Sequence, residues 1–199
     1  MNLSDLLVNL RLPRLRRLPW SRLGRDKDGI SAVEFALIAP VLVCFYFGCI
    51  EISTMLITDR KVTSTAASVG DLVARLPSID TAEMNDIFNS SVINMAPNDL
   101  ADTRIRVTSI EFAPDGVTPV VGWSRSTANW SAFADGDVMT VPAGIIPTDG
   151  SVVFTQVEFD YGSITGLFDP NTGFLFDVSR TMNDSYYARP RRVDIIPFT

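Results

Sequence analysis

The chain has 199 residues, a net charge of −6 and a hydrophobic content of 46%, which suits one folded domain with an appended segment. It contains no histidine, so the commonest general base and zinc ligand is absent. Its acidic balance does not favour a nucleic-acid-binding protein, because phosphate binding needs a basic surface.

The charge is unevenly distributed along the chain. Residues 1–29 carry seven basic and three acidic side chains, a net charge of +4, whereas the remainder carries 10 basic and 20 acidic ones. Because the basic residues directly precede an apolar run, the positive-inside rule predicts that residues 1–29 are cytoplasmic and that the rest crosses the membrane. A solvated basic tail, or a segment lying on an anionic membrane surface, is the alternative interpretation.

The apolar run extends from Ile30 to Ile57, and its 28 residues include only two charges, Glu34 and Glu51. At about 1.5 Å per residue, a helix of this length crosses a hydrocarbon core of about 30 Å. A cleaved secretory signal fits less well, because the run is too long and no small-residue cleavage site follows it. A lipoprotein signal at Cys49 is disfavoured by the bulky residues before it. The run therefore predicts a single transmembrane helix.

The border between the charged stretch and the apolar run carries a recognisable pattern. Gly29 ends the charged stretch, Glu34 stands at the fifth position after it, and the intervening start of the run is rich in small residues. This pattern resembles the class III signal of type IV pilins and pseudopilins, which a prepilin peptidase cuts on the cytoplasmic side after the glycine. The longer string from Gly29 through Glu34-Phe35-Ala36 to Pro40 is similar, more narrowly, to the TadE-like family of tight-adherence systems. The resemblance covers about residues 25–57.

The resemblance implies a minor pilin, or pseudopilin, that is neither an enzyme nor dependent on a cofactor. It implies cleavage between Gly29 and Ile30, and a place in the bacterial inner membrane with a cytoplasmic N-terminus and a periplasmic C-terminal domain. The implied role is initiation or assembly of a Tad (Flp-type) type IV pilus, used for adhesion or secretion, with possible incorporation into the filament. The implied partners are the prepilin peptidase, other major and minor pilins, the inner-membrane assembly platform and the membrane, with no nucleic acid.

The physical chemistry of the run agrees with that resemblance. A charge at the centre of a membrane helix costs roughly 2.5 to 3.5 kcal/mol on insertion scales, so Glu34 calls for a partner. Cleavage would give Ile30 a new α-amino group about 6 Å along the helix from Glu34. In a helical bundle in lipid, the amine of one subunit can neutralise Glu34 of its neighbour, which predicts an assembly contact at Glu34 and Phe35. Alternatively, Glu34 extends to the lipid headgroups and has no such role.

Two further residues of the run have predicted local effects. Pro40 lacks an amide hydrogen and clashes with the preceding turn, so a kink or local loosening of the helix is expected there. Glu51 is either a second polar contact in the bundle or an interfacial residue near the far leaflet, and we favour the latter.

Two helical patterns follow one another after the run. The first continues the membrane helix to about Leu76, before Pro77, so that a single helix is expected over residues 30–76. The second begins at Thr81 and ends before Pro97. The apolar positions that define the two patterns are Val62, Ala66, Val69, Val73 and Leu76, and then Met84, Ile87, Phe88, Val92 and Met95.

From Thr103 onward the period changes to two, which is typical of strands with one wet face. Residues 103–112 and 151–161 alternate clearly, residues 117–123 could lie between them, and a terminal strand is expected around residues 191–196. Asp115-Gly116 predicts a hairpin turn. The expected fold is α+β: a long N-terminal helix, a short helix, and an antiparallel sheet. The expected divisions are a cleaved leader (1–29), the extended helix (30–76) and an exported domain (77–199).

Three features of the exported part have simple interpretations. Asp135-Gly136-Asp137 does not match an EF-hand loop, so turn chemistry is preferred to calcium binding and no metal site is expected. Residues 124–148, which include Trp130, are expected to form a long surface excursion and are the place to look for a partner contact. The basic cluster Arg189, Arg191 and Arg192 is expected to pair within its own domain rather than with a neighbouring subunit.

An enzyme has little support in the sequence. Both cysteines, Cys44 and Cys49, lie inside the apolar run, and the exported part contains neither a phosphate-binding glycine loop nor a nucleophile elbow. The exported part also lacks a disulfide, so its core must hold it together. The main rival to a pilin is a single-pass (bitopic) membrane protein that keeps residues 1–29 and binds a ligand or partner through its outer domain.

Overall fold

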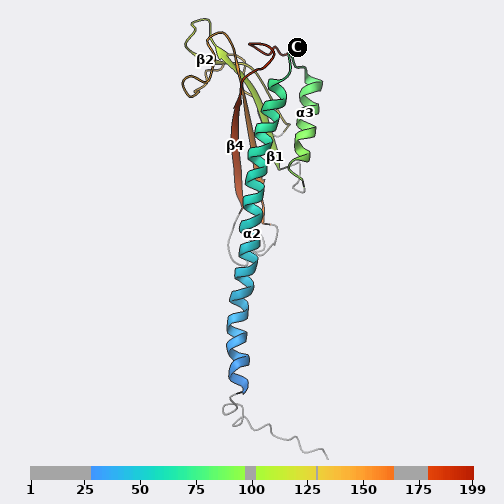
Figure 1. Cartoon of the computed structure of the whole chain (residues 1–199), viewed down its shortest axis with the longest axis vertical. Helices are drawn as coiled ribbons and strands as arrows, with labels where there is room; N and C mark the ends of the chain where they lie inside the picture. Colours follow the sequence, from blue (N-terminus) through green and yellow to red (C-terminus); the bar gives the residue numbers. More distant parts are fainter. Residues whose placement is uncertain (1–27, 97–101, 129, 164–178) are drawn as a thin grey trace, which may run out of the picture. The chain divides into compact units, whose positions relative to one another are not determined.

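The computed structural model describes residues 28–96, 102–128, 130–163 and 179–199. Within these residues the elements follow in the order α2, α3, β1, β2, β3 and β4 (Figure 1). The chain divides into two compact units, Met1–Tyr46 and Phe47–Thr199, and α2 contributes residues to both. The predicted leader lies outside the described residues except for its last two. The α+β class expected from the sequence is confirmed.

Helix α2, Asp28–Ala74, confirms the long helix expected from the sequence. Its helical hydrogen bonding ends three residues before Pro77, in a turn where the Leu76 amide donates to the Val73 carbonyl. The predicted apolar positions form one face, because Val62, Ala66, Val69 and Val73 are all buried. Leu76 packs against the same core while remaining partly exposed.

Helix α3, Thr81–Ile93, begins with a capping box that the sequence analysis did not recognise. The Glu83 amide donates to Asp80 Oδ1 over 2.8 Å, and the Asp80 amide donates back to Glu83 Oε2 over 3.2 Å. This reciprocal pair satisfies two of the amides that a helix start leaves without partners, and Asp80 rather than Thr81 is therefore the N-cap.

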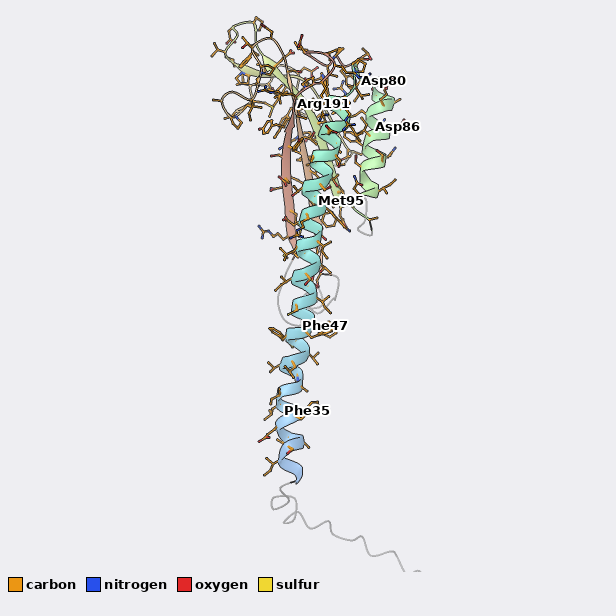
Figure 2. The ribbon with its side chains drawn as sticks, viewed as in Figure 1. Phe35, Phe47, Asp80, Asp86, Met95 and Arg191 are labelled. Carbon is orange, nitrogen blue, oxygen red and sulfur yellow. The ribbon has the colours of Figure 1, made fainter. Side chains whose placement is uncertain are left out.

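One face of α3 is buried, as its pattern predicted. Met84 and Phe88 are buried, as is Met95 just beyond the helix, while Ile87 is half-buried. The side chain of Val92 lies outside the described part. Figure 2 shows Asp80 at the start of α3 and Met95 past its other end.

The sheet has four antiparallel strands in the order β2-β1-β3-β4. Strands β1, β2 and β3 confirm three predicted strands. However, β2 lies at an edge rather than between the other two, and β1 pairs directly with β3, with Val107 opposite Thr155. Strand β4, at the other edge, was not predicted. The bounds are Thr103–Phe112 for β1, Pro119–Ser126 for β2, Val152–Tyr161 for β3 and Arg180–Ala188 for β4.

The strand predicted at residues 191–196 is wrong, because this segment caps a helix instead of joining the sheet. The Arg191 amide donates to the Ala74 carbonyl over 2.8 Å, and the Arg191 guanidinium pairs with Asp71. Both contacts suit the end of α2, where carbonyls lack intrahelical partners and positive charge is favourable. Further on, the Ile196 carbonyl accepts a 2.7 Å hydrogen bond from Trp123 Nε1.

The predicted hairpin turn between β1 and β2 is confirmed. Gly116 has a φ of 67°, a conformation that favours glycine, and Asp115 Oδ1 accepts 2.9 Å hydrogen bonds from the amides of Val117 and Thr118. The Thr118 hydroxyl donates to Asp115 Oδ2 over 2.5 Å. With the hydroxyl bond as the largest cause, these contacts lower the pKa of Asp115 to about 2.

The sheet separates two apolar clusters. Its inner face, which carries Ile105, Val107 and Val157, packs against α2 and α3 and forms the larger core. Its outer face carries a smaller cluster around Ile110 and Phe154, covered by residues such as Met139 and Ile145 of the segment after β2. The rest of the outer face is polar, because the side chains alternating with the inner residues include Arg104 and Arg106.

Candidate functional site

The first part of α2 presents apolar side chains that the chain itself does not bury. Among residues 30–50 none is buried, and Phe35 and Leu37 are 69% and 71% exposed. At about 1.5 Å per residue, this stretch measures about 30 Å, the thickness of a hydrocarbon core. Ile30–Ala74 is the helix, within the described residues, that is long and apolar enough to cross a membrane. One such helix near the N-terminus is compatible with a single-pass membrane protein.

The predicted processing and assembly residues all lie in the first turns of α2. Gly29 and Ile30 are helical. Glu34 follows Ile30 by four residues, so Ile30 and Glu34 lie on the same side of the helix about one turn apart. Glu34 and Phe35 are exposed (Phe35 is labelled in Figure 2). Among the described residues Glu34 has no hydrogen bond or ion pair. A carboxylate with an unused bonding capacity therefore stands in an apolar stretch of helix.

Pro40 and the two cysteines, which also lie in this part of α2, neither end the helix nor form a disulfide. Helix α2 continues through Pro40, and the expected kink stays a prediction. Cys44 is half-buried and Cys49 is exposed, and both are free thiols.

Glu51, the second glutamate of the apolar run, has a different environment from either of those predicted for it. Its side chain is 3% exposed, and Tyr161, the last residue of β3, donates a hydrogen bond of 2.8 Å to Glu51 Oε1. The Tyr161 hydroxyl also lies 3.0 Å from Thr54 Oγ1, one turn further along α2. Glu51 thus ties α2 to the end of β3 within the second unit and is not a residue open to the headgroups.

From Ile30 onward, where burial is described, Glu51 is the first buried position of α2. Burial raises the pKa of Tyr161, and the hydrogen bond to Glu51 adds to the increase, while the contact with Thr54 opposes it. The tyrosine is therefore held in its neutral, donating form. Because Tyr161 is 110 residues away from Glu51, the sequence around the glutamate gave no signal of this partner.

An arginine network crosses the polar part of the outer face. Arg104 Nη1 and Nη2 donate to the two carboxylate oxygens of Asp160 over 2.7 and 3.0 Å, and Arg104 Nε donates to Glu158 Oε2 over 3.2 Å. The bond from Arg104, followed by one from Thr181, lowers the pKa of Asp160. Glu158 and Asp160 share a face, as their spacing predicted, and Arg104 pairs with both and offsets part of their negative charge.

A second arginine fixes the segment that follows β2. The guanidinium of Arg106 lies between two rings, 4.1 Å from the centroid of Trp130 and 3.8 Å from that of Phe133. It also donates to the Ser131 carbonyl over 3.0 Å. Burial lowers the pKa of Arg106, against the attraction of Glu158. The predicted surface excursion is thus held on the sheet by cation–π contacts.

Two of the three residues of the basic cluster Arg189, Arg191 and Arg192 have partners within their own unit, as predicted. Arg191 pairs with Asp71 of α2, and Arg189 Nη2 donates to the Gly144 carbonyl over 3.1 Å. Across the described ranges, no group of His, Cys, Asp and Glu side chains could hold a metal ion.

The comparisons with known proteins concern the segment that holds Gly29 and both glutamates. The family model described as TadE-like protein matches residues 29–70. This stretch is a TadE-like segment. The resemblance found in the sequence is confirmed, and the match extends it to Gly70. No curated protein matches the chain, and no solved structure does.

The TadE-like segment begins at the predicted cleavage glycine and ends at Gly70, where α2 packs tightly against the sheet. A Cβ added at Gly70 would lie 3.0 Å from Tyr186 Cδ1 and 3.1 Å from Thr155 Oγ1. The segment therefore includes the exposed stretch of α2 as well as Val62, Ala66 and Val69 of its buried face. The TadE-like family suggests a pilin-like protein associated with a Tad pilus.

Proposed function

We propose that this chain is a minor pilin of a Tad (Flp-type) pilus, cut after Gly29 by a prepilin peptidase and kept in the inner membrane until it assembles with other pilins. The observation that carries the proposal is the TadE-like match over residues 29–70, which begins at Gly29 and includes Glu34. Cleavage there would leave Ile30 as the first residue, with its new α-amino group one helical turn from a carboxylate.

The exposure of the first part of α2 supports a role in assembly. Its apolar side chains need either lipid or neighbouring helices, and Glu34 needs a charge partner that the described part of the chain does not supply. In a bundle of processed subunits, the Ile30 ammonium of one chain would neutralise Glu34 of the next. The pair would then remove part of the cost of a membrane charge on assembly, which is roughly 2.5 to 3.5 kcal/mol at a helix centre and smaller near an end, where Glu34 lies.

The second unit would be the periplasmic part. It has its own core, its polar groups are paired largely within it, and Glu51 of α2 is hydrogen-bonded to Tyr161 of its sheet. The exposed stretch of about 30 Å before Glu51 would then occupy the bilayer, with the assembly platform and the peptidase acting at its cytoplasmic end.

The assembly role of Glu34 predicts a specific pattern of binding. Glu34→Ala should insert into the membrane as well as the wild type does, because it removes a charge, yet co-purify with other pilin-like subunits about tenfold less, since it loses about 1.4 kcal/mol or more of pairing. Glu34→Asp, which keeps the charge, is the matched control. Co-purification from detergent-solubilised membranes, quantified by mass spectrometry, gives the measurement.

A double variant tests whether the loss of association in Glu34→Ala depends on cleavage after Gly29. In a Gly29 variant that the peptidase cannot cut, the Ile30 amine does not form, so adding Glu34→Ala should cost little further association. Equal partner recovery by Glu34→Ala and the wild type would show that the carboxylate is not an assembly contact. The rival interpretation, an uncut single-pass membrane protein, predicts no coupling between the two positions.

A further inference from the structure

The second unit exposes two apolar side chains of α2 directly after Glu51. Ile52 is 62% exposed and Leu56 is 57% exposed. They are four residues apart, so they lie on one side of the helix about one turn from each other. Seven residues beyond Leu56 and on the same side, the Thr63 hydroxyl donates to Asp184 Oδ2 of β4. The exposed apolar stripe is therefore on the side of α2 next to the edge strand β4 (Figure 1).

The register of the sheet places a cation at the same level of the helix. Arg180, the first residue of β4, lies opposite Tyr161 of β3. The Tyr161 hydroxyl donates to Glu51 and lies 3.0 Å from Thr54 Oγ1, so its side chain points toward α2. Residues directly opposite each other on paired strands share a face, so Arg180 is on the α2 side of the sheet as well. Arg180 is thus level with the turn of α2 that carries the apolar stripe.

The charge of Arg180 is not compensated by the chain. Its side chain is exposed, and within the described residues it makes neither a hydrogen bond nor an ion pair. Asp59 of α2 and Asp184 of β4 stand further along the same side, and neither pairs with it; Asp184 accepts from Thr63 and from the Ser185 amide instead. A free cation beside exposed apolar surface suits an anionic amphiphile, because such a ligand needs a charge partner at one part and shelter from water at another.

The place of these residues along α2 indicates which amphiphile fits. The exposed apolar residues 30–50, enough to cross a hydrocarbon core of about 30 Å, end directly before Glu51. Ile52 and Leu56 continue that apolar surface on one side of the helix, while Glu51 is buried against the sheet on another. Arg180 then falls at the level where hydrocarbon gives way to the phosphates of the lipid headgroups. A cation at this depth attracts anionic lipid.

We propose that Ile52, Leu56 and Arg180 form a boundary patch that holds one anionic glycerophospholipid of the outer leaflet. An acyl chain lies along the two apolar side chains, and the phosphate binds the guanidinium. Free phosphate would leave the apolar stripe exposed, and a second apolar helix would leave the cation without a partner. The proposal rests on the membrane placement of α2 in the proposed function, but not on cleavage after Gly29 or on Glu34. Its failure would therefore leave the pilin assignment unchanged.

Lipid binding can be tested on the full chain by native mass spectrometry in lauryldimethylamine oxide, a detergent without phosphate. The probes are phosphatidylglycerol, which is anionic, and phosphatidylcholine, which is neutral overall. We expect phosphatidylglycerol to bind more tightly, and Arg180→Gln to weaken its binding about fivefold, which corresponds to about 1 kcal/mol. The basic residues 1–29 attract anionic lipid equally in every variant, so the difference between variants is the measurement. Equal affinity for the two lipids would overturn the proposal.

Each part of the boundary patch has a matched control at an exposed position elsewhere in the second unit. Arg192→Gln should keep the affinity, because Arg192 follows Ala188 at the far end of β4, about 27 Å from Arg180. Leu56→Ser should weaken binding about threefold, whereas Leu72→Ser, about 24 Å further along α2, should not.

Three results would overturn the proposal. The first is an Arg180→Gln or Leu56→Ser variant that binds phosphatidylglycerol as tightly as its control. The second is displacement of the lipid by inorganic phosphate, which would show that the apolar stripe contributes nothing. The third is a dimer of the chain that Leu56→Ser dissociates, which would show that a second copy covers the stripe in place of lipid.

Discussion

The two compact units of this chain differ in how far their apolar side chains are exposed. In the second unit, Ile105 and Val107 are fully buried between the sheet and the helices, whereas in the first unit Ile38 and Leu37 are more than half exposed. Burial against the chain's own residues contributes folding free energy, while exposed apolar surface of this extent marks contact with a membrane or with other proteins. The first unit therefore depends on its surroundings in a way that the core of the second unit does not.

The two glutamates of α2 show the same contrast in polar terms. Glu51 is buried and accepts a hydrogen bond from Tyr161 of its own chain, whereas Glu34 is exposed and has no partner among the described residues. A buried carboxylate with a fixed donor is a structural contact, because its bonding is satisfied within the fold. A carboxylate that lacks such a donor is available to another chain. The difference predicts that substitutions at the two positions affect different properties.

The largest expected effect tests the contrast between the apolar side chains. Ile105→Ala should reduce the free energy of unfolding of the second unit by about 2 to 5 kcal/mol, because it leaves a cavity in the core. The same change at Ile38 should leave that free energy almost unchanged, since Ile38 is 54% exposed. Denaturant unfolding of the full chain in detergent, followed by tryptophan fluorescence, measures both. Equal losses would show that the two regions do not differ as described.

A smaller effect is expected from the polar contact between α2 and β3. Tyr161→Phe removes the hydroxyl that donates to Glu51, and we expect a loss of about 1 to 3 kcal/mol in unfolding free energy. Tyr186→Phe is the matched control, because Tyr186 is 42% exposed and its hydroxyl makes no hydrogen bond within the described residues. If Tyr161→Phe unfolds at the same denaturant concentration as the control, the contact does not stabilise the docking of α2.

The sequence predicted those parts of the fold whose contacts join residues close together along the chain. Val62, Ala66, Val69 and Val73 revealed the buried face of α2, because a helix repeats its contacts every three or four residues. Strands β1 and β3 were found by alternation, since one of their faces is apolar. Residues within a few positions of one another were enough for these predictions.

The parts that the sequence did not predict depend on distant partners. Strand β4 buries Met182 but exposes most of its other residues, as an edge strand can, so it shows little alternation. The segment at Arg191 was mistaken for a strand, because its partner, the end of α2, is not evident from local pattern. The site divides likewise: Gly29 and Glu34 form a local motif, whereas the place of Arg180 in the boundary patch depends on the register of β3 and β4.

The smallest expected effect concerns acid sensitivity within the second unit. The pKa of Asp115 is lowered to about 2 in the folded state by hydrogen bonds from the turn, against about 3.9 in an unfolded chain. Its contribution to stability is therefore complete above about pH 4 and is lost as the pH falls toward about 2. Asp115→Asn should show a smaller decrease in unfolding midpoint over this range. A decrease identical to that of the wild type would indicate that the turn carboxylate has no role in acid unfolding.

The central claim, that the chain is divided functionally at Gly29, is tested most directly by the intact mass of the membrane-extracted protein. The chain should be expressed with an active or an inactive prepilin peptidase, alongside a second pilin whose cleavage reports peptidase activity. With the active peptidase we predict a mass lower by that of residues 1–29 and an N-terminal sequence that starts at Ile30. An unchanged full-length mass in cells where the reporter pilin is cut would contradict the proposal.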